Sequence, residues 1–386
     1  MNKIIALSIV ACVLVGSAFF FLRNTDSPNP ITNTPKPPTE TADIPAVTVL
    51  MENLEIPWDI AFLPDGKMLV SERPGRLLVV SQNGEPKEIT LDGVRHVGEG
   101  GLLGVTLHPD FAKNHFVYLY ISSGYSKEQT RNRVERYVFA NDTLTDKKII
   151  LDNIPGAIYH DGGRMEFGPD GMLYIATGDA TDSKIAQDKN SLGGKILRLR
   201  DDGKVPSDNP FFKEGSPQMS AIWSYGHRNP QGLAFDSAGR LWETEHGRSG
   251  ITTGLDEINL ITKGGNYGWP KVEGDETEPG MIPPALHSGS KVTWAPASLV
   301  YIPARNNIPE RLFFGGLRGE ALYEVLLENG RVKELKTHFK NEFGRIRTVR
   351  LGPDGILYIT TSNRDSRGSP SDNDDRLIRI NPTKLN

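Results

Sequence analysis

The fold is decided by a short stretch that recurs along the chain, and its clearest copy reads MEFGPDGMLYI at residues 165–175. Two apolar strands flank a Pro-Asp-Gly turn, which is the pattern of an antiparallel β-hairpin. Related copies lie at residues 60–70, 103–120, 232–242, 298–314 and 349–359, and the copy at 298–314 is degenerate. The spacing of the copies leaves room for a four-stranded sheet with its loops.

Six such units predict an all-β fold, a six-bladed β-propeller over residues 46–386, because radial repetition leaves only short, protected sheet edges. Two stacked sandwiches would use the same strands, but they would not explain the recurring turn. Long helical periodicity is absent from the sequence. We expect the ring to close by pairing of the strand at residues 47–50 with the strand near residues 377–380.

The N-terminus carries an apolar run, residues 4–22, between Lys3 and Arg23. At about 1.5 Å per residue the run would span about 28 Å, close to the thickness of a bilayer core. We therefore expect residues 1–23 to be a transmembrane anchor or signal segment, with cleavage or lipidation at Cys12 as the alternatives. Residues 24–45 are rich in Pro and Thr and predict a disordered linker. Each alternative places the body outside the cytoplasm, in the periplasm or at the cell surface.

Composition excludes several classes of function. A formal charge of −4 argues against nucleic acid as the main partner, because binding to phosphates needs a basic face. Cys12, in the N-terminal run, is the only cysteine. The folded body therefore has no disulfide framework, no Cys-based zinc site and no catalytic thiol.

Polar residues gather in four segments, each just before the predicted inner strand of a blade: residues 98–101, 159–164, 226–232 and 344–347. We expect all four to face one end of the central channel. Together with Arg318, the residues Arg228, Arg345 and Arg347 place up to four guanidinium groups near one axis of a net acidic protein, which indicates a small anionic ligand. The competing interpretation for Arg228 is an ion pair with an aspartate of the next blade.

Two further features have a chemical interpretation. His160 precedes a Gly-Gly turn that would lift its imidazole into the channel, where a neutral histidine is a natural general base; the alternative is a structural histidine between blades. His227 is expected to be structural. Residues 255–260 and 264–270 combine carboxylates with glycine-rich loops, which suits Ca²⁺ but does not match the EF-hand spacing.

These motifs resemble those of the glucose/sorbosone dehydrogenase family, soluble quinoprotein sugar dehydrogenases that use pyrroloquinoline quinone (PQQ). The resemblance covers roughly residues 46–383. It rests on Glu-Gly-Gly-Leu-Leu-Gly (99–104), the His160 turn, Gly-His-Arg-Asn-Pro-Gln-Gly (226–232), Asp-Glu-Ile-Asn-Leu (256–260), Gly-Gly-Asn-Tyr-Gly-Trp-Pro (264–270), Gly-Arg-Ile-Arg (344–347) and Thr-Ser-Asn-Arg-Asp (361–365).

The resemblance implies oxidation of an aldose at its anomeric carbon to a lactone, with hydride passing to the quinone and electrons then to an external acceptor, a quinone or a redox protein. It implies that His160 is the base and that Arg228 stabilises charge on the quinone oxygen. The implied cofactor contacts are Glu99, Asn229, Arg318, Arg345, Arg347 and Asn363. The implied sugar contacts are Tyr159 and Gln231.

The resemblance also implies calcium. Main-chain carbonyls near Gly247 and Arg248 would hold one Ca²⁺ beside the quinone, and Glu257 and Tyr267 would contribute to a second, structural site. The sequence departs from the family pattern at Glu99, where glutamine is frequent, at Tyr159, where some glucose enzymes have an acidic residue, and over residues 271–295. A non-catalytic extracellular binding propeller and a Ca²⁺-dependent lactonase are the competing functions.

Overall fold

Each recurring stretch forms the first hairpin of a blade, and in the two copies that contain Gly-Pro-Asp-Gly the aspartate holds the turn. In the copy at residues 165–175, Gly171 adopts a φ of +73°, which favours glycine. Asp170 Oδ1 accepts a hydrogen bond from the Met172 N–H (3.1 Å), and the Tyr174 hydroxyl donates to Oδ2 (3.0 Å). Asp354 makes the same two contacts in the last copy. The recurring Pro-Asp-Gly turn therefore fixes both the bend and the register of the hairpin.

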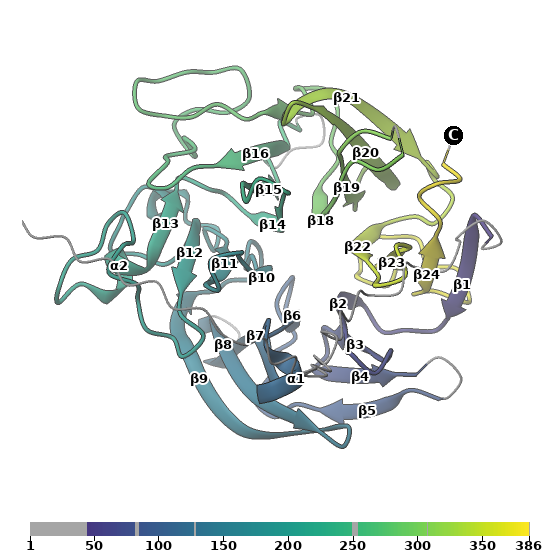
Figure 1. Ribbon diagram of the computed structural model, residues 1–386. Coiled ribbons are helices and arrows are strands. Elements are labelled where there is room, and N and C mark those ends of the chain that lie inside the picture. The colour runs from purple at the N-terminus through teal and green to yellow at the C-terminus, as the bar shows by residue number, and fades with distance from the viewer. Residues whose placement is uncertain (1–44, 82–84, 127–128, 249–253, 307, 386) are drawn as a thin grey trace, which may run out of the picture. The chain divides into compact units, whose positions relative to one another are not determined.

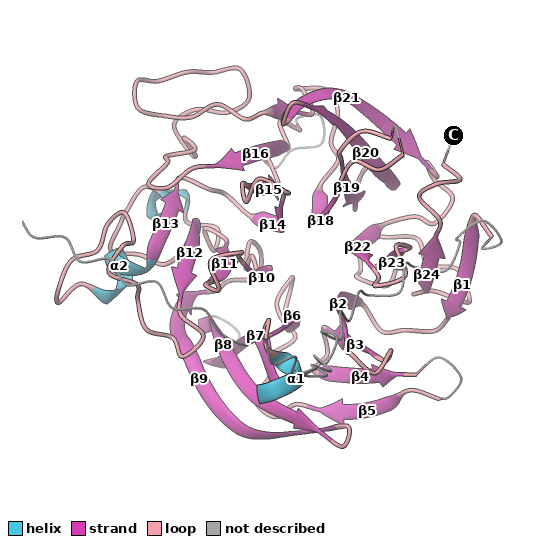
Figure 2. Cartoon of the chain, in the orientation of Figure 1, coloured by secondary structure: helices cyan, strands magenta, loops and turns pink. Residues whose placement is uncertain are grey.

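The structure is a computed structural model that describes residues 45–385, except for residues 82–84, 127–128, 249–253 and 307. Six four-stranded antiparallel sheets follow one another along this part of the chain and surround a central channel (Figures 1 and 2). The predicted six-bladed β-propeller is thereby confirmed.

The first blade consists of β2 (Pro57–Phe62), β3 (Met68–Glu72), β4 (Arg76–Val80) and β5 (Lys87–Thr90). The second consists of β6 (Leu102–Leu107), β7 (Phe116–Ser126), β8 (Gln129–Ala140) and β9 (Thr143–Pro155). The third consists of β10 (Met165–Phe167), β11 (Leu173–Thr177), β12 (Lys195–Leu199) and β13 (Ile222–Tyr225). The next two consist of β14 (Pro230–Phe235), β15 (Leu241–Glu245), β16 (Glu257–Ile261) and β17 (Leu286–His287); and β18 (Pro296–Ile302), β19 (Arg311–Gly316), β20 (Ala321–Glu328) and β21 (Arg331–His338).

The sixth blade closes the ring with a strand from the other end of the chain. It consists of β22 (Ile346–Leu351), β23 (Leu357–Thr361), β24 (Leu377–Ile380) and β1 (Val47–Met51). β1 pairs with β24, as predicted, and places Val47 opposite Ile380 and Val49 opposite Ile378. The innermost strands contact one another in ring order, and β2 contacts β22.

Helices are short and lie in connections. They are α1 (Phe111–Asn114), the 3₁₀ turn η2 (Ser183–Ala186) and α2 (Pro217–Ala221). Within the described ranges, no helix is long and apolar enough to cross a membrane. The predicted membrane segment and nearly all of the predicted linker fall outside those ranges, so both stay predictions.

Apolar side chains fill the space between neighbouring blades, whereas the channel carries charge. Trp58, Leu103, Tyr118 and Met165, from the first three blades, belong to one buried cluster. Along the channel, Arg350 of β22 donates to Asp59 of β2 (3.0 Å) and to Glu166 of β10 (2.9 Å). This bridge ties three blades together at the axis below the functional end.

Candidate active site

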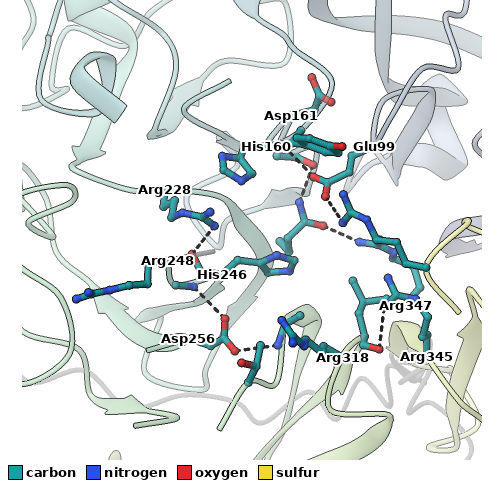
Figure 3. A pocket seen from close by; sticks show the side chains of 18 of the residues that line it. Glu99, His160, Asp161, Arg228, His246, Arg248, Asp256, Arg318, Arg345 and Arg347 are labelled. Atoms are coloured by element: carbon teal, nitrogen blue, oxygen red, sulfur yellow. Dashed lines mark hydrogen bonds and ion pairs between the residues drawn. The ribbon is translucent and has the colours of Figure 1, made fainter. Parts of the chain in front are cut away.

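A cavity with a volume of about 320 Å³ opens at one end of the channel (Figure 3). Residues from all four predicted polar segments line it, which confirms that these segments meet. Its wall is made by Trp58, Glu99, Tyr159, His160, Asp161, Gly162, Arg228, Gln231, His246, Gly247, Arg248, Asp256, Thr293, Ala295, Leu317, Arg318, Arg345, Arg347 and Arg367. Six of these residues are arginines, so the cavity of this net acidic chain is rich in cationic groups.

One side, which we call the base wall, consists of Glu99, Tyr159, His160 and Asp179. The His160 Nδ1 lies 2.7 Å from Asp179 Oδ1. An ionised carboxylate only accepts hydrogen bonds, so Nδ1 carries the proton and Nε2 keeps its lone pair. Asp179 is itself fixed, because it accepts hydrogen bonds from the Trp269 indole N–H (2.8 Å) and the Thr181 N–H (2.9 Å). This arrangement presents an oriented imidazole to the cavity.

Glu99 supports the base from the loop that precedes β6. Its Oε2 accepts a hydrogen bond from the His160 main-chain N–H (2.9 Å), and its Oε1 lies 2.6 Å from Arg367 Nη1. Burial alone would raise the pKa of Glu99, but the positive charge of Arg367 and further nearby groups lower it to about 2. Glu99 is therefore a carboxylate, and its charge is balanced within the protein.

A second group of lining residues, which we call the arginine wall, consists of Arg318, Arg345 and Arg347. Arg345 and Arg347 flank Ile346, the first residue of β22, and both line the cavity. Arg345 Nη2 forms an ion pair with Asp365 (2.7 Å), which lies in the same blade, between β23 and β24. Arg318 is exposed at the cavity rim.

Arg347 is the most deeply placed member of the arginine wall. Its Nη1 donates to Gln231 Oε1 (2.8 Å), and its Nε is buried without a hydrogen-bond partner in the part of the chain that the structure describes. Burial lowers the pKa of Arg347 to about 9, although the nearby Asp365 opposes the shift. The guanidinium is still charged at neutral pH, and it lacks a direct acidic partner among the described residues.

Arg228 and His246 lie between the two walls (Figure 3). The Arg228 main-chain N–H donates to Glu245 Oε2 (2.6 Å), and its Nη1 donates to the His246 carbonyl (3.4 Å). His246 follows the last residue of β15 and has a buried Nε2 with no partner among the described residues. Burial lowers the pKa of His246 to about 3, so its ring is neutral.

Gly247 and Arg248 continue the chain along the cavity wall. The Gly247 N–H donates to Asp256 Oδ1 (2.9 Å), and Asp256 Oδ2 accepts the N–H groups of Trp294 (2.6 Å) and Ala295 (2.9 Å). Asp256 therefore ties this segment to the chain before β18. The Arg248 side chain points away to Glu273. Its carbonyl and that of Gly247 remain the candidate calcium ligands.

Several predicted site residues do not line the cavity. Asn229 supports it from behind, because its Oδ1 accepts the Gly162 N–H (3.1 Å) and the Gln231 amide (3.2 Å). Asn363 likewise accepts the Arg345 main-chain N–H (2.8 Å) and donates to the Phe343 carbonyl (2.9 Å). Both residues hold cavity-lining neighbours in place.

Glu257 and Tyr267 lie apart from the cavity lining. The Tyr267 hydroxyl donates to the Leu260 carbonyl (2.6 Å) and accepts the Thr262 N–H (2.8 Å), so it is already used by the main chain. Burial, with the negative charge of Glu245 nearby, raises the pKa of Glu257 to about 8. His227 is fully buried between Ser224 and Glu245, as expected for a structural histidine.

Three residues at the site were missed by the sequence reasoning, namely Asp179, His246 and Arg367, and Asp161 was identified only as part of the polar segment 159–164. Asp161 sits beside the predicted base, and burial raises its pKa to about 7. Asp179 and His246 each come shortly after an inner-hairpin strand, β11 and β15, and this position is a signal that points to the channel end. Arg367 has no local signal, because its partner Glu99 lies far away in the sequence.

The fold and the cavity define a class of protein, a six-bladed β-propeller with a buried, cation-rich small-molecule site at one end of its channel. The family model "Glucose / Sorbosone dehydrogenase" matches residues 54–376. The chain is 36% identical over 358 residues to the aldose sugar dehydrogenase YliI of Escherichia coli, covering 87% of this chain and 92% of that protein. The chain belongs to the glucose/sorbosone dehydrogenase family.

Other relatives fit this membership. The quinoprotein glucose dehydrogenase B of Acinetobacter calcoaceticus is 35% identical over 268 residues, which cover 60% of this chain and 54% of that protein. The PQQ-bound structure of an aldose sugar dehydrogenase from Streptomyces coelicolor superposes with a TM-score of 0.76 at 37% identity, covering 87% of this chain and 98% of that one.

Proposed function

We propose that the protein is a PQQ-dependent dehydrogenase that oxidises aldoses at the anomeric carbon to lactones. Family membership supports the class of enzyme. The observation that carries the proposal for this chain is the pair of buried nitrogen atoms without a partner among the described residues, Arg347 Nε and His246 Nε2, on side chains that line the cavity together with an oriented imidazole. Buried polar groups are nearly always satisfied, so these two atoms indicate a polar ligand.

The residues present fit PQQ, a planar molecule with three carboxylates. The volume of about 320 Å³ lies at the lower end of the usual range for small-ligand pockets. Arg318, Arg345 and Arg347 would bind the carboxylates. The Nε of Arg347 has no hydrogen-bond partner among the described residues and would donate to one of them. Asn229 and Asn363 would act through the residues they hold, Gln231 and Arg345, which changes their predicted role from direct contact to support.

When bound, the cofactor would supply the acceptor for the hydride from the sugar's anomeric carbon. The chain's own residues supply the acid–base chemistry and the positioning. His160 Nε2 would take the proton of the anomeric hydroxyl, and Asp179 would stabilise the imidazolium that results. Arg228 would stabilise negative charge that develops in the cavity, where low polarity strengthens such interactions. Tyr159, at the mouth, and Gln231 would contact the sugar.

Calcium remains part of the proposal. The carbonyls of Gly247 and Arg248 would hold one Ca²⁺ at the cavity wall, since hard oxygen ligands on a loop suit this ion. In the second, structural site, Glu257 would supply a carboxylate, whereas Tyr267 would contribute its carbonyl because its hydroxyl is already used. An external electron acceptor and an extracytoplasmic, membrane-anchored location also stay proposals.

The lactonase alternative needs a metal held by carboxylates at the channel centre. Two of the carboxylates that line the cavity are already occupied, Glu99 by Arg367 and Asp256 by three main-chain N–H groups. A non-catalytic binding module would have no use for the Asp179-oriented His160. Both observations favour the dehydrogenase.

The test is reconstitution of the purified full-length apoprotein with PQQ and Ca²⁺, followed by an assay of aldose-dependent reduction of an artificial dye across a panel of sugars. We expect turnover that requires PQQ. Binding is followed independently by quenching of tryptophan fluorescence, because Trp58 lines the cavity. If the apoprotein does not bind PQQ and shows no turnover with any sugar of the panel, the proposal is wrong.

A further inference from the structure

Arg367 lies at the cavity mouth, in the connection between β23 and β24. Its guanidinium lies 5.0 Å from the centre of the Tyr159 ring and forms an ion pair of 2.6 Å with Glu99. The Arg367 side chain is 46% exposed, whereas the Glu99 side chain is only 18% exposed. The ion pair thus joins the sixth blade to the loop before the second blade, and the ring contact joins it to the loop before the third blade. Both partners of Arg367, Glu99 and Tyr159, belong to the base wall.

The partner of this ion pair holds the main chain of the base. His160 has a φ of +65°, a conformation that a residue with a side chain adopts rarely and at a cost. Glu99 Oε2 accepts the His160 N–H (2.9 Å), and the His160 carbonyl accepts the Ala180 N–H (3.2 Å). Glu99 is therefore one of the two main-chain contacts that keep the imidazole pointed into the cavity.

Arg367 is also tied to the arginine wall. Its main-chain N–H donates to Asp365 Oδ1 (3.0 Å), and Asp365 Oδ2 pairs with Arg345 (2.7 Å). The Arg367 loop is thereby positioned by the same residue that would bind a cofactor carboxylate. The contacts run in a continuous series from Arg345 through Asp365 and Arg367 to Glu99 and His160.

We propose that Arg367 is a positioning residue for the base, acting through Glu99, and this inference rests on the proposed dehydrogenase function. A mostly buried carboxylate without a cationic partner would take up a proton or turn toward water. Turning toward water removes the acceptor that Glu99 offers to the His160 N–H, and protonation weakens it, because a neutral carbonyl oxygen accepts less strongly than a carboxylate. A glutamine at position 99 offers a neutral amide oxygen in the same place and needs no cation. The ion pair is thus required only because this chain has Glu99.

The test is a double-mutant cycle of R367Q and E99Q in the full-length protein, with R367K as the conservative variant. R331Q, at the exposed first residue of β21, is the matched control for loss of one positive charge. We measure kcat and KM for an aldose, the PQQ affinity by tryptophan quenching, and Tm for each variant.

R367Q is expected to lower kcat at least tenfold while PQQ affinity changes less than threefold. E99Q supplies the reference activity for the glutamine background, in which water can solvate the half-exposed Arg367. In the E99Q background, R367Q is expected to lower kcat less than threefold, and R367K is expected to stay within threefold of the unsubstituted protein.

If R367Q lowers kcat equally in the unsubstituted and the E99Q proteins, the inference is wrong. It is also wrong if R367Q does not lower kcat while Glu99 is present. These outcomes are distinct from failure of the proposed function. If the unsubstituted protein neither binds PQQ nor oxidises sugars, the dehydrogenase assignment fails. If it is active and the cycle is additive, only the role of Arg367 fails.

Discussion

The base wall and the arginine wall belong to one cavity, but their polar atoms are satisfied to different degrees. At the base wall, both oxygens of Asp179 and both oxygens of Glu99 have protein partners. At the arginine wall, Arg347 keeps a buried Nε without a partner among the described residues. The carboxylates of one wall are satisfied by protein partners, whereas the other wall keeps unused hydrogen-bonding capacity.

This difference separates two kinds of catalytic contribution. Groups that are fixed before the ligand arrives need no reorganisation during the reaction, which suits a general base. Groups that leave hydrogen-bonding capacity unused in a buried position favour binding, because a ligand removes the cost of the unsatisfied atom. Substitutions on the two walls should therefore affect different quantities.

The largest expected effect comes from removing the base. H160A should lower kcat by about 10²- to 10⁴-fold, the usual contribution of a general base. The affinity for PQQ should stay within about tenfold, or about 1.4 kcal/mol, because the arginine wall is untouched. Steady-state kinetics and fluorescence quenching measure the two quantities. Full activity of H160A would show that His160 is not the base.

On the arginine wall the expected loss is in binding. R347Q should weaken PQQ affinity by at least about 30-fold, because loss of one buried charged contact costs about 2 kcal/mol or more. R345Q is the matched comparison on the same wall. It breaks the buried pair with Asp365 and should lower the free energy of unfolding by about 3 kcal/mol, which urea denaturation measures. Equal PQQ affinity in R347Q and the unsubstituted protein would contradict the wall's role.

A smaller effect is expected at the carboxylate that orients the base. D179N retains the size of the side chain but removes the charge that fixes the Nδ1 proton and stabilises the imidazolium. We expect kcat to fall by about 10- to 100-fold, part of the contribution of the base itself. KM and PQQ affinity should change little. A loss confined to PQQ affinity would instead assign Asp179 to cofactor binding.

The smallest expected effect concerns pH and the buried carboxyl beside the base. Burial raises the pKa of Asp161 from 3.8 to about 7. The folded protein therefore holds this proton more tightly, and the stability it contributes is present below pH 4 and is lost as pH rises through about 7. In D161N, the free energy of unfolding should decrease less steeply as the pH rises from 4 to 7. Chemical denaturation at several pH values measures the slope, and an unchanged slope would contradict the assignment.

The fold could be predicted from the sequence because its information is local. Each Pro-Asp-Gly copy encodes its own turn through contacts such as those of Asp170, all within a few residues. The meeting of the polar segments followed from the repeat, since the residues that precede the inner strands share one end of the channel.

The direction in which each site side chain points, and the pairing of residues that lie far apart in the sequence, could not be predicted. The motif containing Asn363 was identified, but only the structure shows that its amide supports Arg345 from behind. The Glu99–Arg367 pair joins loops that are adjacent only because the ring closes. His246 directly precedes the predicted calcium ligands Gly247 and Arg248. It was not predicted, because its buried Nε2 without a hydrogen-bond partner among the described residues is a result of packing that the sequence does not show.

The most direct measurement is an equilibrium titration of the full-length apoprotein with PQQ, followed by tryptophan fluorescence, on the unsubstituted protein, H160A and R347Q. The account predicts saturable quenching for the unsubstituted protein, a Kd within tenfold for H160A, and a Kd raised at least about 30-fold for R347Q. Absence of quenching in the unsubstituted protein, or a Kd that is unchanged in R347Q, would contradict a cavity whose arginine wall is completed by this ligand.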